Sequence, residues 1–578
     1  MYQRSLGRIV VVCLLFAGTA ASAGQAQQSP PGGQPGTAPL PPRVGVIAGA
    51  ELLDLQRAVE MALENNPDIL VARLGVGAAD FQSAAARGVY DVNLSSNSFF
   101  EHLVSPVASI IGGGANGQLT QDTLTANAGV GGLTPWGGGS YQVDFSSTRF
   151  ESDNQFTTLN PQFPTAFRAT YAQPLGRGFT FDAPRRQIEI ARRNETVSQA
   201  GFRQRALEVV TGVEQAYWNL VAAVRNFDTQ RQALDQARAQ VQSNRRMADA
   251  GILAPIAVVE AETQAATFEE ALYAAQQGVT RAENALKQLI LPDRSSPLWH
   301  RALQPATVAD PVLVEPDLEA AVVRALANRP EIVQQEAAAA IADVDVRYFQ
   351  DQTRPQVDLV GTFSVSGLAG NVISRGPNPI TASTLVLQER INELSRLSGL
   401  PELPPSSGGS LPELLVGGYG QSLRTLTEGN FPAARVDLRL QLPLRNRTAE
   451  ANLAVARLQR QQVHAQRIQV EQAIEAQVRD ALQTVRSARG RLGAATTARA
   501  SAQVQYESEQ RQFEAGTSTV FLVLQRQTAL VTAQAREIQA ETDLQNALAL
   551  LRNATGEALD RWNIRLQVPP TVPPSSGR

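Results

Sequence analysis

The chain has 578 residues, of which 18% are charged and 6% are aromatic, and its formal net charge is -3. Positive and negative residues are interspersed, so the sequence lacks the clustered basic surface of nucleic-acid-binding proteins. Few aromatic residues together with abundant Ala, Gln and Arg are typical of long helices that pack through small side chains. Composition therefore argues against a nucleic-acid partner and favours a largely helical architecture.

The N-terminal segment has the features of a secretory signal peptide. Residues 1–23 begin with Arg4 and Arg8, continue with an apolar run and end in an Ala-Ser-Ala cleavage motif. The single cysteine of the chain, Cys13, lies inside this segment. We therefore expect an exported mature chain with neither a disulfide bond nor a thiolate metal site.

Two further segments have the composition of unstructured chain. Residues 24–50 are rich in Pro, Gly and Gln and predict a flexible linker, and residues 563–578 are rich in Pro and Ser and predict a disordered tail. Beyond the signal peptide, no apolar stretch is long enough to form a transmembrane helix. If the protein enters a membrane, it must do so with strands.

The rest of the chain contains an internal duplication. Residues 54–67 (DLQRAVEMALENNP) match residues 317–330 (DLEAAVVRALANRP) at an offset of 263, from 54 to 317. In each copy an Asp caps a short helix, and Asn-x-Pro ends that helix and begins a second one. We therefore predict two repeats, residues 51–310 and 311–562, with opening helices over residues 51–88 and 316–352.

After the opening helices the apolar period changes from helical to two. Tyr141, Val143 and Phe145, for example, alternate with polar residues. We expect strands within residues 89–176 of the first repeat, which has room for four, and within residues 356–445 of the second. Surface loops are expected over residues 103–118 and, as a long insertion, over residues 366–430, the second with a helix over residues 382–397.

Each repeat then ends in a long helical hairpin. The segments 184–291 and 447–555 each begin with a helix of about 100 Å that contains no proline beyond Pro184 at the start of the first, followed by a shorter returning helix. Gly251 and Gly516 lie at the breaks and suit the left-handed residue that closes a helix. Apolar residues step by four and three along these helices, as in a coiled coil or a closed helical barrel. The hairpin tips are therefore expected at one end and the strands at the other.

The sequence contains no motif for catalysis or cofactor binding. His102, His300 and His464 lack the paired spacing of a metal site. No G-x-S-x-G or P-loop motif occurs, and the glycine-rich residues 112–117 lead into a strand and not into a helix. We therefore expect no enzymatic activity, no cofactor and no bound metal.

The strands favour a shared membrane barrel over a soluble sheet. They are too few for a sandwich, and an open sheet edge favours aggregation. A barrel needs about eight strands or more to enclose an interior, so several copies of the chain would have to contribute to one barrel. The alternative is a non-channel periplasmic coiled-coil scaffold protein whose strands form a soluble dimerisation sheet.

This order of elements resembles the TolC-type outer membrane efflux channels over nearly all of residues 51–562. The resemblance includes both Asn-x-Pro helix breaks, the strand exit Gln173-Pro174-Leu175, and both glycine tips. It implies a TolC-like fold, mainly α with a β-barrel portion, in which a homotrimer shares a 12-stranded transmembrane β-barrel above a periplasmic α-barrel. The four candidate strands of the first repeat and the long insertion leave open a barrel with more strands, or an extracellular extension.

The resemblance also implies a location and a function. The protein would lie in the outer membrane of a Gram-negative bacterium, in contact with outer membrane lipid, as the channel of a tripartite efflux or type I secretion system. It would passively conduct small toxic molecules or secreted polypeptides from a periplasmic adaptor and an inner-membrane pump. The resemblance places adaptor docking at the tips, with four candidates: Arg246, Gly251, Arg511 and Gly516.

In this family the residues just past each tip glycine narrow the periplasmic entrance, often with acidic rings. Here Leu522 and Gln525 stand where two aspartates commonly stand. Two arrangements remain open for Leu522, an apolar ring in the lumen or a side chain buried in its helix pair. In the first repeat Ala257 stands near the equivalent position, and acidic selectivity would have to come from Glu260 and Glu262 one turn further on.

Overall fold

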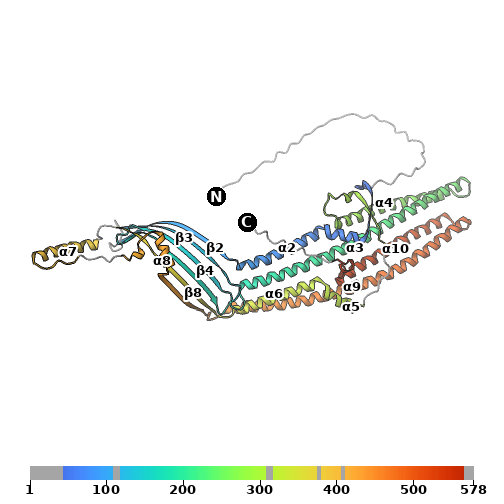
Figure 1. Cartoon of the computed structure of the whole chain (residues 1–578). Coiled ribbons are helices and arrows are strands. Elements are labelled where there is room, and N and C mark those ends of the chain that lie inside the picture. The colour runs from blue at the N-terminus through green and yellow to red at the C-terminus, as the bar shows by residue number, and fades with distance from the viewer. Residues whose placement is uncertain (1–42, 109–116, 308–316, 374–378, 405–410, 565–578) are drawn as a thin grey trace, which may run out of the picture. The chain divides into compact units, whose positions relative to one another are not determined.

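Long helices, one curved antiparallel sheet and a small two-stranded parallel sheet make up the folded part of the chain. The antiparallel sheet lies at one end of the helices and the hairpin tips at the other (Figure 1). The computed structural model describes residues 43–108, 117–307, 317–373, 379–404 and 411–564. Residues from Ile47 onward form one unit, to which the description below refers. The expected signal peptide and most of the expected linker and tail lie outside the described residues.

The first half of the chain alternates between strands and helices as the duplication predicts. It contains β1 (Ala48–Leu53), α1 (Leu55–Asn65), α2 (Pro67–Arg87), β2 (Asn93–Pro106), β3 (Gln118–Leu133), β4 (Ser140–Ser152), β5 (Leu159–Gln162), β6 (Thr165–Pro174), α3 (Ala183–Asp249), α4 (Ile256–Ile290) and β7 (Arg301–Pro305).

The second half repeats this order with fewer strands. It contains α5 (Leu318–Asn328), α6 (Pro330–Gln352), β8 (Gln356–Gly367), β9 (Gly370–Val372), α7 (Pro379–Leu397), α8 (Tyr419–Thr427), β10 (Phe431–Gln441), α9 (Arg447–Glu514) and α10 (Val520–Thr555).

The caps that the sequence predicts are present at the first helix of each half. Asp54 accepts a hydrogen bond from the Gln56 amide, and Asp317 accepts one from the Glu319 amide, at 3.3 and 3.2 Å. Each cap satisfies one of the amides that the first helical turn leaves without an intrahelical partner. The duplication is therefore reproduced at the level of single hydrogen bonds.

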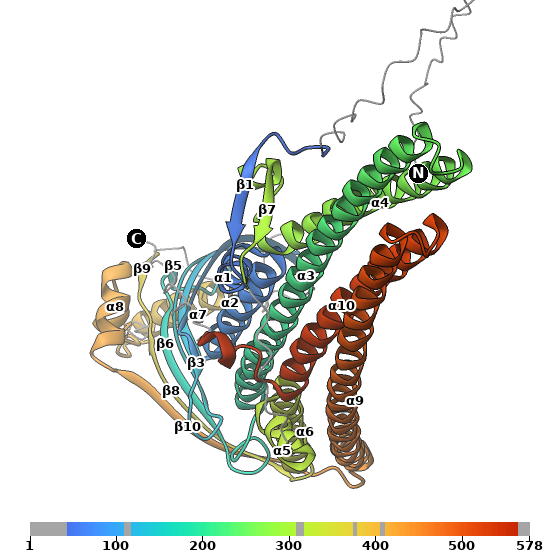
Figure 2. The same cartoon turned by 90° about the vertical axis from the view of Figure 1, so that its right-hand side faces the viewer.

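The two long helices, α3 and α9, organise the helical part. The shorter helices α2 and α4 both pack along α3, and α6 and α10 both pack along α9, so two short helices match one long one as predicted. Viewed from the tip end, α3 and α10 lie side by side between α4 and α9 (Figure 2). The predicted apolar seams are buried, with Val213, Tyr217 and Leu220 in one core cluster. A second cluster contains Ile474, Val478, Leu482 and Val485.

The main sheet has the strand order β10-β8-β6-β4-β3-β2, and all neighbours are antiparallel. Four of these six long strands come from the first half and two from the second, as the alternation predicts. Short β5 pairs with β4 and β9 beside this path. No helix in the described part of the chain is long and apolar enough to span a membrane.

The expected start of the first opening helix at residue 51 is wrong. Residues 48–53 form β1, which pairs in parallel with β7, and the helix begins only at Leu55. Residues outside the strand hold it in place, because Leu53 is buried in the core and the Tyr217 hydroxyl donates to the Leu53 carbonyl oxygen at 3.0 Å. This pairing joins segments about 250 residues apart in the chain, which a local pattern does not reveal.

The two expected loops are also shorter than predicted. Strand β2 continues to Pro106, and β3 begins at Gln118, so both strands enter the segment 103–118. The insertion 366–430 contains β9, α7 and α8. Helix α8 is attached to the sheet, because the buried side chains of Ser422 and Thr165 are hydrogen-bonded at 2.9 Å.

One buried ion pair connects α4 to the β1–β7 pair. Lys287, the only lysine in the sequence, has a side chain that is 1% exposed. Its ammonium group donates to Glu283 Oε1 at 2.6 Å, to the Trp299 carbonyl at 3.1 Å and to the Arg301 carbonyl at 2.6 Å. All three ammonium donors are therefore satisfied away from water.

Candidate functional site

The two hairpin tips have the same backbone geometry. Gly251 has φ +72° and Gly516 has φ +75°, the left-handed conformation that favours glycine. The next amide closes the last turn of each long helix, from Ile252 to the Met247 carbonyl and from Thr517 to the Gln512 carbonyl, both at 2.9 Å. This is the Schellman arrangement. Open space surrounds both glycines, so the backbone conformation and not crowding requires them.

The two hairpins contact each other just behind their tips. Ala257 of α4 is 8% exposed and packs with Val520 and Leu524 of α10, and Leu253 and Phe513 border this cluster. The structure thus places Ala257 in the seam between the hairpins, at the same level as the start of α10.

Buried polar groups behind the tips bond both within the first hairpin and across this seam. Asn244 of α3 is fully buried and donates to the Ala257 carbonyl of α4 at 3.2 Å. The buried Gln527 side chain of α10 donates to the Ala233 carbonyl of α3 at 3.5 Å. Because both amides are out of water, losing either partner would leave a buried polar group unsatisfied. The seam is therefore specified by hydrogen bonds as well as by apolar packing.

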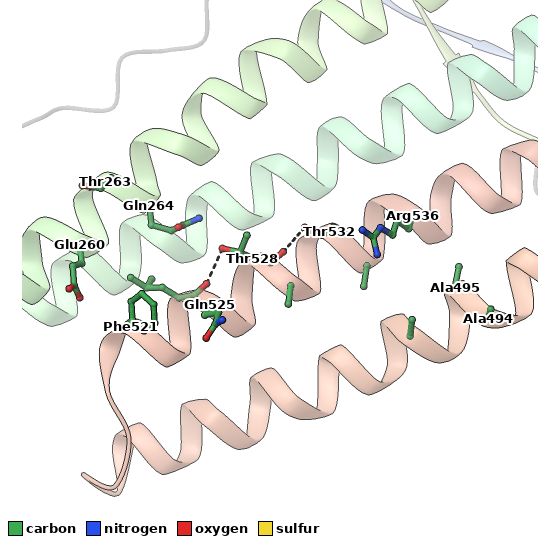
Figure 3. A pocket seen from close by; sticks show the side chains of 14 residues that line it. Glu260, Thr263, Gln264, Ala494, Ala495, Phe521, Gln525, Thr528, Thr532 and Arg536 are labelled. Carbon is green, nitrogen blue, oxygen red and sulfur yellow. Dashed lines mark hydrogen bonds between the residues drawn. The ribbon is translucent and has the colours of Figure 1, made fainter.

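Two of the entrance candidates lie in one groove. Glu260 of α4 and Gln525 of α10 both line a groove of about 960 Å³ between α4, α10 and α9, which we call the tip groove (Figure 3). Leu522 is 37% exposed but is not part of its lining, whereas the neighbouring Phe521 is. Glu262 is exposed and forms an ion pair with Arg245.

The sequence analysis missed the residues that continue the tip groove along α10. Thr528, Thr532 and Arg536 follow Gln525 at helical spacing and line the same groove. The two hydroxyls donate to backbone carbonyls one turn earlier, at 2.9 and 2.8 Å (Figure 3). The 3-4-4 spacing of polar residues was the available signal. The opposite wall is formed by small residues of α9: Ala494, Ala495 and Ala498.

The docking candidates lie at the ends of the hairpins. Arg246 and Arg511 are both exposed in the last turns of α3 and α9, just before Gly251 and Gly516. A cation at this position interacts favourably with the carbonyl end of its helix. Each tip therefore presents an exposed guanidinium beside an exposed turn.

Ion pairs along the surface join the helices behind the tips. Arg238 of α3 pairs with Glu269 of α4 at 3.3 Å, and Arg499 of α9 pairs with Glu537 of α10 at 2.9 Å. These pairs are partly exposed, so each contributes at most about 1 kcal/mol.

Burial raises the pKa of Tyr506 on α9. Within the described residues, no cluster of His, Cys, Asp and Glu could hold a metal ion.

Comparison with known structures finds the same fold. CmeC, the outer membrane channel of Campylobacter jejuni, aligns with a TM-score of 0.58 and 14% identity over 87% of this chain and 86% of its own. VceC, an outer membrane protein of Vibrio cholerae, aligns with a TM-score of 0.56 and 16% identity over 87% and 96%. CusC aligns with a TM-score of 0.59 and 16% identity over 91% and 99%.

Comparison of sequences identifies the family. No curated protein matches the chain. The profile of the family described as "Outer membrane efflux protein" matches residues 152–290 and 407–557, which together make up half of the chain and include both hairpins. The chain belongs to the outer membrane efflux protein family, and it is a TolC-type outer membrane efflux channel with a periplasmic helical part, not an enzyme.

Proposed function

We propose that three copies of the mature chain, after removal of residues 1–23, form the outer membrane duct of a tripartite system. The sheets of the three copies share one barrel in the membrane, and the helices form a tube below it. The observation that carries this proposal is the distance between the sheet and the hairpin tips. Helices of 67 and 68 residues, each about 100 Å long, separate the sheet from two tips that lie at the same level. A duct across a periplasm requires this separation.

The tips are the proposed docking surface for a periplasmic adaptor, which connects the duct to an inner-membrane pump. Arg246 and Arg511 supply one exposed charge at each tip, next to Gly251 and Gly516. The energy for transport then comes from the pump, and the channel itself conducts passively. Its cargo is of the class that such systems export, small toxic molecules or secreted polypeptides.

The tip groove is the proposed inner wall of the periplasmic entrance. Glu260 and Gln525 line it together, so three copies would place a ring of three carboxylates beside a ring of three amides. A carboxylate ring attracts cations and repels anions. Leu522 and Glu262 lie outside the groove lining, and Ala257 lies in the hairpin seam, so selectivity is assigned to Glu260.

Particle mass and conductance test this function. The protein purified from membranes in detergent is expected to have the mass of three chains and to open ion-conducting channels in planar bilayers. A protein that stays soluble without detergent and opens no conductance would instead support the periplasmic scaffold, whose strands form a soluble sheet.

A matched pair of variants tests the entrance. Glu260→Gln is expected to lower the preference for cations over anions in the bilayer recordings, because it removes the three charges of the proposed carboxylate ring, one from each copy. Glu270→Gln changes an exposed carboxylate of the same helix that does not line the groove, and it should leave the preference unchanged. Equal ion preference in both variants would reject Glu260 as the selectivity residue.

A further inference from the structure

The extent of the exposed apolar surface of the sheet indicates how many strands of one copy cross the membrane in the proposed barrel. The sheet has six long strands in one continuous hydrogen-bonded ladder, whereas a 12-stranded trimeric barrel needs only four from each copy. Either two strands lie outside the membrane, or all six cross it. A strand that crosses a membrane in a barrel must alternate apolar residues toward lipid with polar residues toward the lumen.

All six long strands carry apolar residues on the same face. The pairing connects Leu94 to Val130, Val130 to Val143, Val143 to Ala169 and Ala169 to Phe363, so these residues form one row across β2, β3, β4, β6 and β8. On β10 the same face carries Val436, Leu438 and Leu440, which are 76%, 66% and 61% exposed. We call this the apolar face; other exposed members are Phe100, Leu124, Phe167, Tyr171 and Leu359.

The opposite face of the sheet is mainly polar. It carries Asn127 on β3, Asp144 on β4, Arg168 on β6 and Thr362 on β8. On β10 it carries Arg435, Asp437 and Arg439. An extracellular extension in water would gain nothing from a large exposed apolar face on every strand. The apolar face therefore places all six strands in lipid.

The two edges of the sheet are complementary in direction. Within the described residues, no strand pairs with the outer edge of β2 or of β10. Strand β2 follows helix α2 and runs away from the helices, whereas β10 runs back toward them and leads into α9. The β2 edge of one copy can therefore join the β10 edge of the next copy as an antiparallel pair, and this joining leaves no open edge.

The register of the edges fits this joining. Strands in membrane barrels tilt by about 35–45°, lie about 4.8 Å apart and rise about 3.3 Å per residue, so crossing six strands shifts the register by about 6–9 residues. The row of paired residues that starts at Asn97 on β2 ends at Phe431 on β10. An even shift keeps both side chains on the same face. A shift of six residues sets Asn97 opposite Asp437, and a shift of eight sets it opposite Arg439.

Either of these shifts makes the two edges overlap completely. A shift of six sets residues 431–441 of β10 opposite residues 93–103 of β2, and a shift of eight sets them opposite residues 95–105, all within β2. Without a shift, only five residues of each strand would overlap, and a shift in the other direction would set Asn97 beside α8. At the larger shift Glu101 also lies opposite Arg435, a favourable cross-strand pair.

We propose that all six long strands of each copy enter the barrel, and that the β2 edge of one copy pairs with the β10 edge of the next at a shift of six or eight residues. The inference rests on the proposed trimer, which then has an 18-stranded barrel. Because barrel diameter grows about linearly with strand number, its interior is about one and a half times as wide as that of a 12-stranded barrel.

Disulfide cross-linking in the full-length protein tests the joining, because the expected mature chain contains no cysteine. Asn97→Cys is combined with Asp437→Cys or with Arg439→Cys, and the cells' outer membranes are oxidised. One of the two pairs is expected to give covalent dimers and trimers and nothing larger. Asn97→Cys alone is the control for random collision. The detergent-particle mass of each reduced variant is compared with that of the parent, which separates a folding defect from a missing cross-link.

A second pair of variants represents the competing arrangement. If β2 and β3 lay outside the barrel, β4 would be the edge that meets β10, and Ser146→Cys would cross-link to Arg435→Cys or Asp437→Cys. Such cross-links in a particle of trimer mass, without cross-links from Asn97, would overturn the six-strand barrel and leave the trimer intact. A particle with the mass of one chain would overturn the trimer itself, and with it the 18-stranded barrel.

Discussion

The buried Lys287–Glu283 pair gives a sharp prediction about stability. Lys287→Met keeps an unbranched apolar stem but removes the ammonium group, which donates to Glu283 and to the carbonyls of Trp299 and Arg301. The Glu283 side chain is only 2% exposed, so the variant removes the ammonium partner of a buried carboxylate. Removing one partner of a buried ion pair costs about 3–5 kcal/mol. We expect a loss of this size.

The loss should concentrate where Lys287 acts, at the contact between α4 and the β1–β7 pair. A chain of this size does not unfold in a single two-state step, so hydrogen exchange of the β1 and β7 amides in the detergent-solubilised protein is the appropriate measurement. In Lys287→Met, the free energy of the local opening that exposes these amides should fall by about 3–5 kcal/mol. The fall is smaller for any amide that already exchanges by global unfolding. Amides in the middle of α9 provide the internal control.

A double variant separates the charge from the packing. Lys287→Met combined with Glu283→Leu removes both charges, and replacing a buried ion pair by apolar side chains is often neutral or stabilising. The double variant should therefore protect β1 and β7 better than the single one. If the single variant costs less than about 1 kcal/mol, or if the double variant is no better, the ion pair does not hold this region together.

Three further predictions concern the tips and the sheet. Gly516→Ala should cost about 1–2 kcal/mol because φ is +75°, whereas Gly490→Ala inside α9 has open space and should stabilise by about 0.5–1 kcal/mol; hydrogen exchange of the amides flanking each glycine compares them. Leu522→Asp should raise cation selectivity in bilayers if Leu522 faces the lumen of the assembly, and unchanged selectivity in a stable variant rejects that placement. Leu438→Arg should destabilise the membrane-inserted protein by about 2–4 kcal/mol, whereas Arg439→Leu, on the other face, should be tolerated; equal urea midpoints in lipid would contradict the assigned faces.

Local signals in the sequence were sufficient for the helices and for most of the sheet. Asp54 and Asp317 predict where helices start, and Gly251 and Gly516 predict where helices end. These signals are local because a helix cap and a left-handed residue both act on neighbouring peptide groups. The alternation at 141–145 identifies a strand in the same way. The pairing of β1 with β7 was missed because its energy comes from a partner about 250 residues away. Nothing within residues 48–53 encodes that partner.

The site was harder to predict than the fold because it depends on helix rotation. The sequence indicated the first turns after each glycine, and Glu260 and Gln525 do share a groove. Successive side chains of a helix point about 100° apart around its axis. For this reason Phe521 lines the groove and the next residue, Leu522, does not. The rotation of α10 is set by Val520 and Leu524 packing on Ala257, a contact between the two repeats that no single repeat reveals.

The even number of long strands has a consequence for assembly. Because β2 and β10 run in opposite directions, a ring of two, three or four copies would close with an identical antiparallel joint. The sheet by itself therefore cannot select the number of copies. That selection falls to the angle at which the helices of neighbouring copies pack, so substitutions on the outer sides of α4 and α9, and not in the strands, are the ones that could change the stoichiometry.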